Sequence, residues 1–415
     1  MDISKFKGII QKLSFIKDYS SLVIPIVILF VAAILFIPTQ LISAKLREQM
    51  GKESIQGGGN KVKQLSKDVV PVKQWEKERD YQQVYVEDAN QIALLARRSS
   101  ERELLSYRVF PEPNEKSPLI FKEFGKQFRG KIEEMLERIK ALDSPADSEL
   151  QAHLEGIKSS SRSDTKVSTA ESSERDNLIK DELCRERAAS IRVYVNPAAL
   201  SGYDFWDEYE YVGTNQAVED CWYWQLGYWI IEDIINTVDV MDSGSSSVLT
   251  SPVKRVMSVS FSRSDVKSEN VKTDNIILPH YVIARENGLV DSYTARICSS
   301  DIDVVHFTVS VLVSVKAVIP FMLQLCTARE HKFMGFSGKD APSVFKHNQI
   351  TILDSKMSPI IRESKEHQLY RYGNDAVVKL DLVCEYVFNK SGYDAIRPVS
   401  TKELTRSETG KISNE

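Results

Sequence analysis

The stretch VVHFTVSVLVSV, Val304–Val315, decides the fold class of this 415-residue chain. From Val305 to Val315, apolar residues occupy every second position and mainly polar residues lie between them. A period of two is typical of a β-strand with one face against a core and the other toward water. His306 falls on the second face, so we expect an ordinary surface histidine there.

Residues 301–390 contain the other elements that this strand needs to enclose a core. Pro320 suits the first turn of a short helix. The residues expected to face inward from this helix are Ile319, Met322, Leu323 and Cys326. Two more strands are predicted at Gln349–Asp354 and Ala376–Phe388, where apolar residues alternate. The order strand, helix, strand, strand predicts an antiparallel sheet with a helix on one face.

Residues 176–300 show a similar alternation and are predicted to form a first α/β module. A strand from Ile191 to Val195 ends before Asn196-Pro197, and a second strand is expected over 253–262. Between them, residues 217–241 have the period of an amphipathic helix. Its apolar stripe consists of Trp222, Leu226, Trp229, Ile230, Ile234 and Val238. The predicted fold class is therefore α+β, with helices packed on mainly antiparallel sheets.

Residues 73–142 are predicted to form two long helices. Residues 73–107 lack proline and glycine, and residues 121–142 carry apolar side chains at steps of three and four. That stripe consists of Phe121, Phe124, Phe128, Ile132, Met135, Ile139 and Leu142. The pair predicts a helical hairpin or a stalk, depending on whether the stripe faces its own chain or another. We take the first six stripe residues as candidate partner contacts.

Three segments are expected to lack regular structure. Residues 44–72 include QGGGN, Gln56–Asn60, which is typical of a flexible linker. Residues 143–175 are rich in serine and poor in large apolar residues, so they cannot bury enough surface to offset ordering. Residues 391–415 are expected to form a disordered tail.

Residues 20–43 are predicted to be a transmembrane helix that contacts the lipid bilayer. Leu22–Pro38 contains no charged residue, and with its polar extension it approaches the roughly 20 residues that span a bilayer. Pro25 and Pro38 lie near the ends, where they are tolerated. A cleaved signal peptide is the alternative, but its apolar run is usually shorter.

The flanking cations predict the orientation of this helix. Lys5, Lys7, Lys12 and Lys17 precede it, and Lys45, Arg47 and Lys52 follow it. By the positive-inside rule, residues 1–19 form a cytoplasmic tail and the C-terminal region is extracytoplasmic.

Composition and motifs exclude several classes of function. The formal charge of -4, with both signs interleaved, gives no basic field for nucleic acid. The five cysteines form no CxxC pair, and the six histidines are scattered, so no metal site is indicated. There is no GxSxG, HExxH or P-loop signature. We expect no enzyme activity and no cofactor.

The segment Tyr203–Trp229 is unusually rich in aromatic residues. Its acidic residues Asp204, Asp207, Glu208 and Glu210 are expected to keep the loop solvated. Core packing accounts for part of the aromatic set, and exposed aromatic residues are enriched where partners dock. Trp206, Trp224 and Tyr228 are therefore further candidate contacts.

The whole arrangement resembles the PilO and GspM proteins of type IV pilus and type II secretion systems. The resemblance is carried by VVHFTVSVLVSVKAVIPFMLQLCTAREHKFM, ITILD and AVVKLDLVCEYVF, which look like the strand, helix, strand, strand unit of that family, and by the anchor. It implies ferredoxin-like modules and a non-enzymatic scaffold that pairs through its stalk in the inner membrane.

Two functions follow as hypotheses. The first is a single-pass membrane scaffold of a bacterial envelope assembly, with protein partners or self-association. The alternative is a membrane-tethered sensor or ligand-binding protein that uses the aromatic cluster at 203–229.

Overall fold

The computed structural model describes residues 20–53, 55–67, 72–160, 169–261, 278–282 and 294–402. The chain divides into two compact units, Met1–Ala89 and Asn90–Glu415. The expected cytoplasmic tail, residues 1–19, lies outside the described residues.

The first unit contains helix α3 (Ser20–Glu53), helix α4 (Ile55–Lys67) and the start of helix α5 (Val72–Ser99). Helix α3 includes Pro25–Met50, which is long and apolar enough to cross a membrane, and none of its apolar window is buried in protein. The structure thus confirms the predicted N-terminal helix that is long and apolar enough to cross a membrane. Both internal prolines are accommodated within it.

The flexible linker predicted over residues 44–72 is largely helical instead. Helix α3 continues to Glu53, and the three consecutive glycines lie inside α4. The residues after the apolar run are mostly strong helix formers, and these propagate a helix once it has begun.

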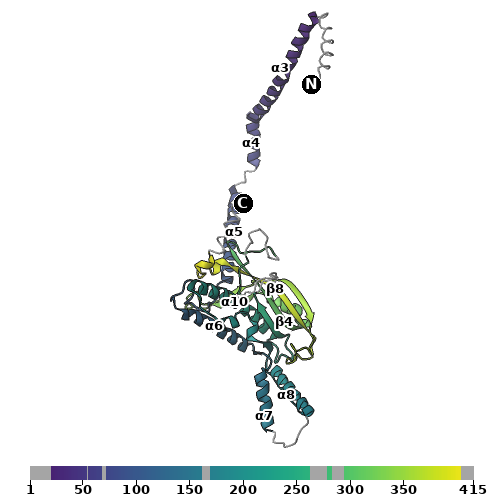
Figure 1. The fold of residues 1–415 in the computed structure, drawn as a ribbon. Coiled ribbons are helices and arrows are strands. Elements are labelled where there is room, and N and C mark those ends of the chain that lie inside the picture. The colour runs from purple at the N-terminus through teal and green to yellow at the C-terminus, as the bar shows by residue number, and fades with distance from the viewer. Residues whose placement is uncertain are drawn as a thin grey trace. The chain divides into compact units, whose positions relative to one another are not determined.

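The second unit is built on a six-stranded sheet (Figure 1). In spatial order its strands are β1 (Ala141–Leu142), β2 (Val193–Val195), β3 (Val253–Ser260), β4 (Ile302–Ser314), β8 (Val377–Asn389) and β7 (Ile350–Pro359). The first three are parallel neighbours, and the others pair antiparallel. Strands β5 (Arg329–Phe333) and β6 (Ser343–His347) form a separate hairpin.

This single sheet corrects the prediction of two modules at 176–300 and 301–390. Strand β3 of the first segment pairs with β4 of the second, from Val253 opposite Val313 to Ser260 opposite Thr308. Without the other segment, the paired edges of β3 and β4 would expose backbone polar groups. The strands predicted in both segments are confirmed, but they share one core.

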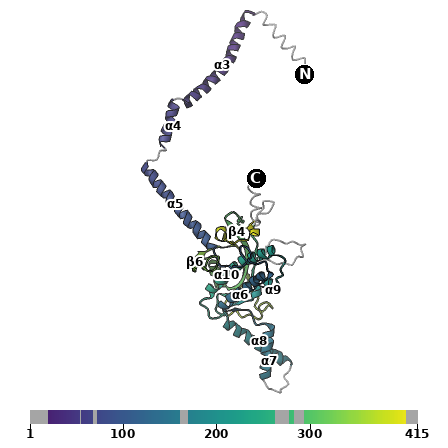
Figure 2. The same cartoon turned by 90° about the vertical axis from the view of Figure 1, so that its left-hand side faces the viewer.

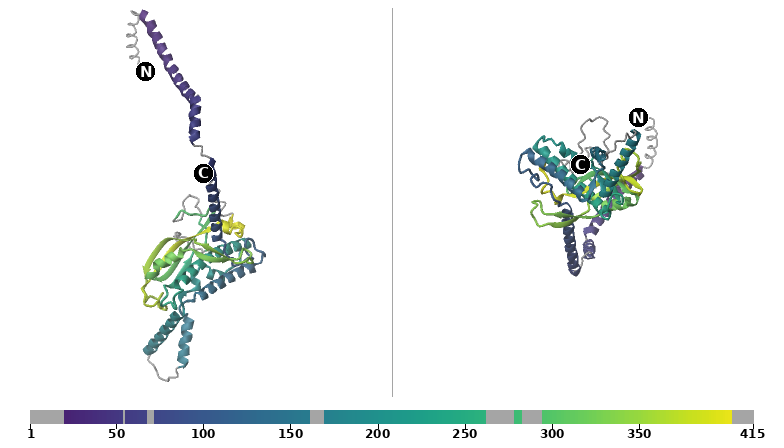
Figure 3. Two further views of the ribbon diagram at one scale, coloured as in Figure 1. Left: turned by 180° about the vertical axis from the view of Figure 1, so that it is seen from behind. Right: turned by 90° about the horizontal axis from the view of Figure 1, so that it is seen from below.

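The major helices cover one face of the sheet (Figures 1 and 3). Helix α10 (Thr214–Asp242) confirms the predicted helix, and its buried residues lie around its whole circumference. Helix α6 (Pro118–Arg138) packs on α10, and the short helix α9 (Tyr203–Asp207) packs on α6 (Figure 2). The segments η1 (Pro197–Ala199), η2 (Val315–Ala317) and η3 (Lys390–Gly392) are single 3₁₀ turns.

Two segments expected to be disordered are folded in the described part of the chain. Helices α7 (Asp147–Ser160) and α8 (Thr169–Ser190) occupy most of 143–175 and pack on each other, while residues 161–168 lie outside the described residues. A few apolar side chains, Leu150 and Cys184 among them, are buried there. Of the predicted tail, residues 391–402 are folded, with Tyr393 fully buried.

Helix α11 (Val318–Leu325) presents a different face from the predicted one. Val318, Phe321 and Leu325 are buried, whereas Ile319 and Leu323 are 63% and 65% exposed. The residues of this helix are nearly all apolar, so sequence periodicity cannot fix which face is turned inward.

Candidate ligand-binding site

The six candidate partner contacts of helix 121–142 are core residues. Phe121, Phe124, Phe128 and Ile132 have no exposed surface, and Met135 and Ile139 are nearly as buried. Phe128 packs edge-on against Trp224 and Tyr228 of α10. The stripe therefore faces its own chain, so these six residues are not contacts with another chain.

Trp206, Trp224 and Tyr228 are also buried, with 7%, 1% and 8% of their surface exposed. Trp206 lies over Gly125 so closely that a Cβ atom at that position would stand 2.4 Å from the indole ring. These three residues are therefore not an exposed docking surface. Their neighbours in sequence, however, line an opening.

A cavity of about 650 Å³ lies beside α9 and the first turns of α10. Phe205 stands between Tyr209 and Trp224, with ring centroids 5.7 and 5.5 Å away. We call this space, with the lining given next, the acidic aromatic cavity. It is lined by Ala198, Leu200, Ser201, Gly202, Asp204, Phe205, Glu208, Tyr209, Glu210, Val212, Gln216, Asp220, Trp224 and Leu278.

The position of α9 depends on a glycine. Gly202, the residue before the helix, has φ of 96°, a left-handed conformation that side-chain-bearing residues rarely adopt. A Cβ atom there would also meet Trp224 at 2.6 Å. The small residue lets the turn approach the indole and directs Asp204 and Phe205 toward the cavity.

Four carboxylates line the cavity: Asp204, Glu208, Glu210 and Asp220. Within the part of the chain that the structure describes, none of them forms an ion pair, and no lysine, arginine or histidine lines the cavity. The neighbouring Asp207, by contrast, pairs with Arg129. The loop thus holds an uncompensated negative charge.

Asp220 is the most buried of the four, with 7% of its surface exposed. Among the described residues, its one side-chain hydrogen bond comes from Gln216 Nε2 to Oδ1 at 2.9 Å, so Oδ2 has no donor. Burial raises the pKa of Asp220, and the hydrogen bond from Gln216 lowers it only in part. Burial, Cys221 and Asp220 likewise raise the pKa of Tyr209.

This lining is suited to binding. Its described side chains are mainly carboxylates and aromatic rings, with Ser201 and Gln216 as neutral polar groups. Aromatic rings and carboxylates are the groups that attract organic cations. The sequence signal was present in YDFWDEYEY, Tyr203–Tyr211, where acidic and aromatic residues alternate. Sequence reasoning took the acids only as solvating groups.

A second polar cluster lies at the centre of the same unit. Asp233 Oδ2 accepts hydrogen bonds from Arg102 at 3.0 Å, His347 Nε2 at 2.9 Å and Tyr386 at 2.7 Å. Burial alone raises the pKa of Asp233, but Arg102 and His347 together hold it well below its ordinary value. A cavity of about 580 Å³ opens beside this cluster.

The protonation of this cluster follows from its geometry. His331 Nε2 faces the carbonyl oxygen of Glu101 at 2.9 Å, so it must donate. Burial, with help from Arg102 and His347, lowers the pKa of His331 to about 4, so its Nδ1 is an acceptor. His347 Nδ1 lies 2.9 Å from His331 Nδ1, and His347 Nε2 lies 2.9 Å from Asp233 Oδ2. The cluster satisfies its own charges and acts as a structural core.

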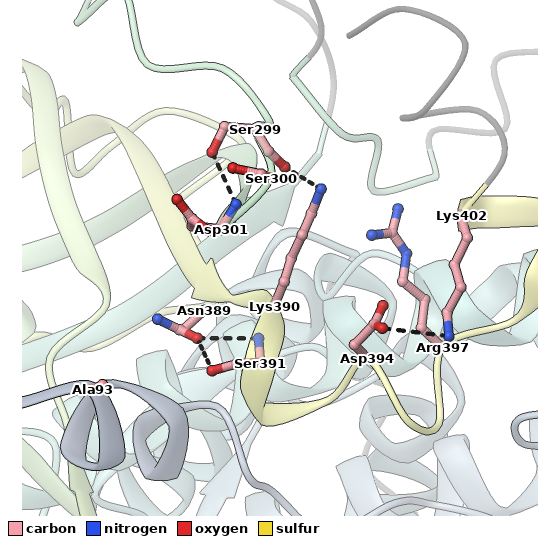
Figure 4. Close-up of a pocket in the computed structure, with 10 residues that line it drawn as sticks. All are labelled: Ala93, Ser299, Ser300, Asp301, Asn389, Lys390, Ser391, Asp394, Arg397 and Lys402. Carbon is pink, nitrogen blue, oxygen red and sulfur yellow. Dashed lines mark hydrogen bonds and ion pairs between the residues drawn. The ribbon is translucent and has the colours of Figure 1, made fainter. Parts of the chain in front are cut away.

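A further cavity of about 760 Å³ is lined by several paired charges (Figure 4). Lys390 and Arg397 pair with buried Asp303 at 3.2 and 3.1 Å. Lys402 pairs with Asp394 at 3.6 Å. The acidic aromatic cavity differs from both in that none of its four lining carboxylates forms an ion pair among the described residues.

No family model, curated protein or solved structure matches this chain. The fold and the cavity therefore carry the functional argument.

We expect Asp220→Asn to raise the stability of the full chain at neutral pH. The pKa of Asp220 is higher in the folded state than in the unfolded state, so its ionised form lowers the unfolding free energy as pH rises through that range. Asparagine keeps an acceptor for Gln216 and removes the charge. The urea midpoint should rise at about pH 7.5, and the difference should vanish below about pH 4, where the unfolded acid is protonated too. A lower midpoint at neutral pH would contradict the account.

Proposed function

We propose that this chain is a single-pass membrane protein whose α/β unit binds a positively charged organic ligand in the acidic aromatic cavity. The supporting observation is the set of four lining carboxylates without an ion-pair partner among the described residues. Like charges gathered in one place repel each other and lower stability. A ligand that supplies the missing positive charge relieves this repulsion on binding, and functional sites commonly retain such unfavourable groups.

The binding proposal predicts selectivity by charge. Butylammonium should bind the purified full chain at low ionic strength, while butanol and butyrate, which have the same carbon number, should not. Glu208→Gln and Asp220→Asn should each weaken binding several-fold, because each removes one attractive charge. Glu186→Gln, a neutralisation on the exposed face of α8, should leave binding unchanged. Isothermal calorimetry measures all of these, and equal binding of the three compounds would exclude a cation site.

We propose that α3 anchors the chain in the inner membrane, with the N-terminus cytoplasmic and the α/β unit extracytoplasmic. The supporting features are the length and apolar character of α3 and the excess of lysines before it. The chain should remain with membranes after carbonate extraction, and a reporter fused after Lys52 should give an extracytoplasmic signal. A cytoplasmic signal would reverse the proposed orientation.

A scaffold role of the pilus or secretion type, with ferredoxin-like contacts and a stalk, is the second candidate. It is favoured by helix α5, on which Trp75, Tyr81, Tyr85, Ile92 and Leu95 are each at least 60% exposed. Exposed apolar residues in such number are typical of a surface that another helix covers. The proposed stalk contact thus belongs to α5, since the stripe of α6 is internal.

Cross-linking tests the scaffold candidate. A cysteine introduced at Tyr85 should give a disulfide-linked dimer in oxidised membranes if α5 pairs with a second copy. Glu87→Cys, two residues away and on a different side of the helix, is the matched control and should cross-link less. A chain that stays monomeric with both variants and shows no other membrane partner would remove this candidate.

A further inference from the structure

We propose that the ligand of the acidic aromatic cavity is an aliphatic diamine or polyamine. This inference rests on the proposed cation-binding function and specifies the ligand's chemistry. Three properties of the lining carry it: the separation of the carboxylates, the excess of hydrogen-bond acceptors and the aromatic surface.

The carboxylates come from different elements. Asp204 lies on α9, Glu208 and Glu210 follow it in the loop, and Asp220 lies on α10. Within the described residues, no group of three acidic, histidine or cysteine side chains stands close enough to hold a metal ion. A single metal ion therefore does not match this arrangement. A molecule with several positive charges spaced along its length matches carboxylates that come from different elements.

The hydrogen-bonding character of the lining selects among such molecules. Carboxylates only accept, and one of the two N–H groups of the Gln216 amide donates to Asp220. The other lining side chains that carry a donor are Ser201, Tyr209 and Trp224. A primary ammonium group offers three donors and no acceptor. A peptide would bring carbonyl oxygens as well, and buried acceptors without donors are destabilising.

The aromatic wall fits the carbon chain between the charges. Phe205 and Tyr209 are half-buried aromatic residues of the cavity lining, and Phe205 lies against the buried Trp224. Methylene groups bury apolar area on such rings, and adjacent ammonium groups gain cation–π attraction. The volume of about 650 Å³ lies within the range of roughly 300–1,000 Å³ that is usual for small-molecule sites.

Asp220 is the natural first anchor for an ammonium group. It is more than nine-tenths buried, it lines the cavity, and Oδ2 has no hydrogen bond from a described residue. Glu208 and Glu210 are exposed at the opening. One ammonium of the ligand would bind Asp220 and a second would bind the exposed acids, so affinity should increase with the second charge.

The experiment compares butylamine with 1,4-diaminobutane, which has the same carbon chain and one more ammonium group, and with spermidine. Calorimetry on the full chain in detergent, at matched ionic strength, measures each dissociation constant. We expect the diamine and spermidine to bind at least about ten-fold more tightly than butylamine, or roughly 1.4 kcal/mol. Glu208→Gln should remove most of this advantage, and Glu186→Gln should not.

The alternatives give distinct results. Equal affinities for butylamine and the diamine would overturn the polyamine inference while leaving a cation site in place, and no binding by any amine would overturn both. Spermidine can also be competed with magnesium chloride and with sodium chloride at the same ionic strength. If magnesium chloride displaces more spermidine than sodium chloride does, the cavity attracts positive charge without selecting an amine. Tighter binding of tetralysine than of spermidine would assign the site to a basic peptide. Urea unfolding of Glu208→Gln and Asp220→Asn checks that any loss of binding is not a loss of fold.

Discussion

Helix α10 is buried around its whole circumference, and the rest of the α/β unit depends on that burial. The sheet lies against one side of it and α6 against another, and the buried apolar residues of α10 belong to the larger of the two hydrophobic clusters found among the described residues. A helix that is apolar on all sides is stable only in such an interior. Trp222, Trp224 and Trp229 supply much of its buried area.

On this buried helix, some polar groups have several protein partners and others line an opening. Asp233 illustrates the first case, because Arg102, His347 and Tyr386 all donate to it. These partners come from the segment before α6, from β6 and from β8, so one carboxylate joins three distant parts of the chain. Removing one partner of a buried ion pair typically costs about 3–5 kcal/mol.

Asp220 illustrates the second case on the same helix. It is almost as buried, yet it has one amide partner and no cation among the described residues. The loop beside it adds three more acids and the aromatic side chains of α9. Asp233, with three donors, lies in the interior, whereas Asp220, with one, lines the cavity that we assign to a ligand.

The sequence by itself determined the local elements: the apolar helix α3, the helical period of α10 and the alternation in β3, β4 and β8. The spacing of apolar residues indicates that one face of a helix or strand is buried, because backbone geometry alone fixes which side chains share a face. The spacing does not indicate what covers that face. Only the tertiary structure decided that Phe128 packs on α10 instead of on a second chain. It also decided that β3 pairs with β4 to make one sheet of two segments, and that Asp204 and Asp220 line one cavity. Each of these depends on contacts between residues far apart in the chain, which no local period encodes.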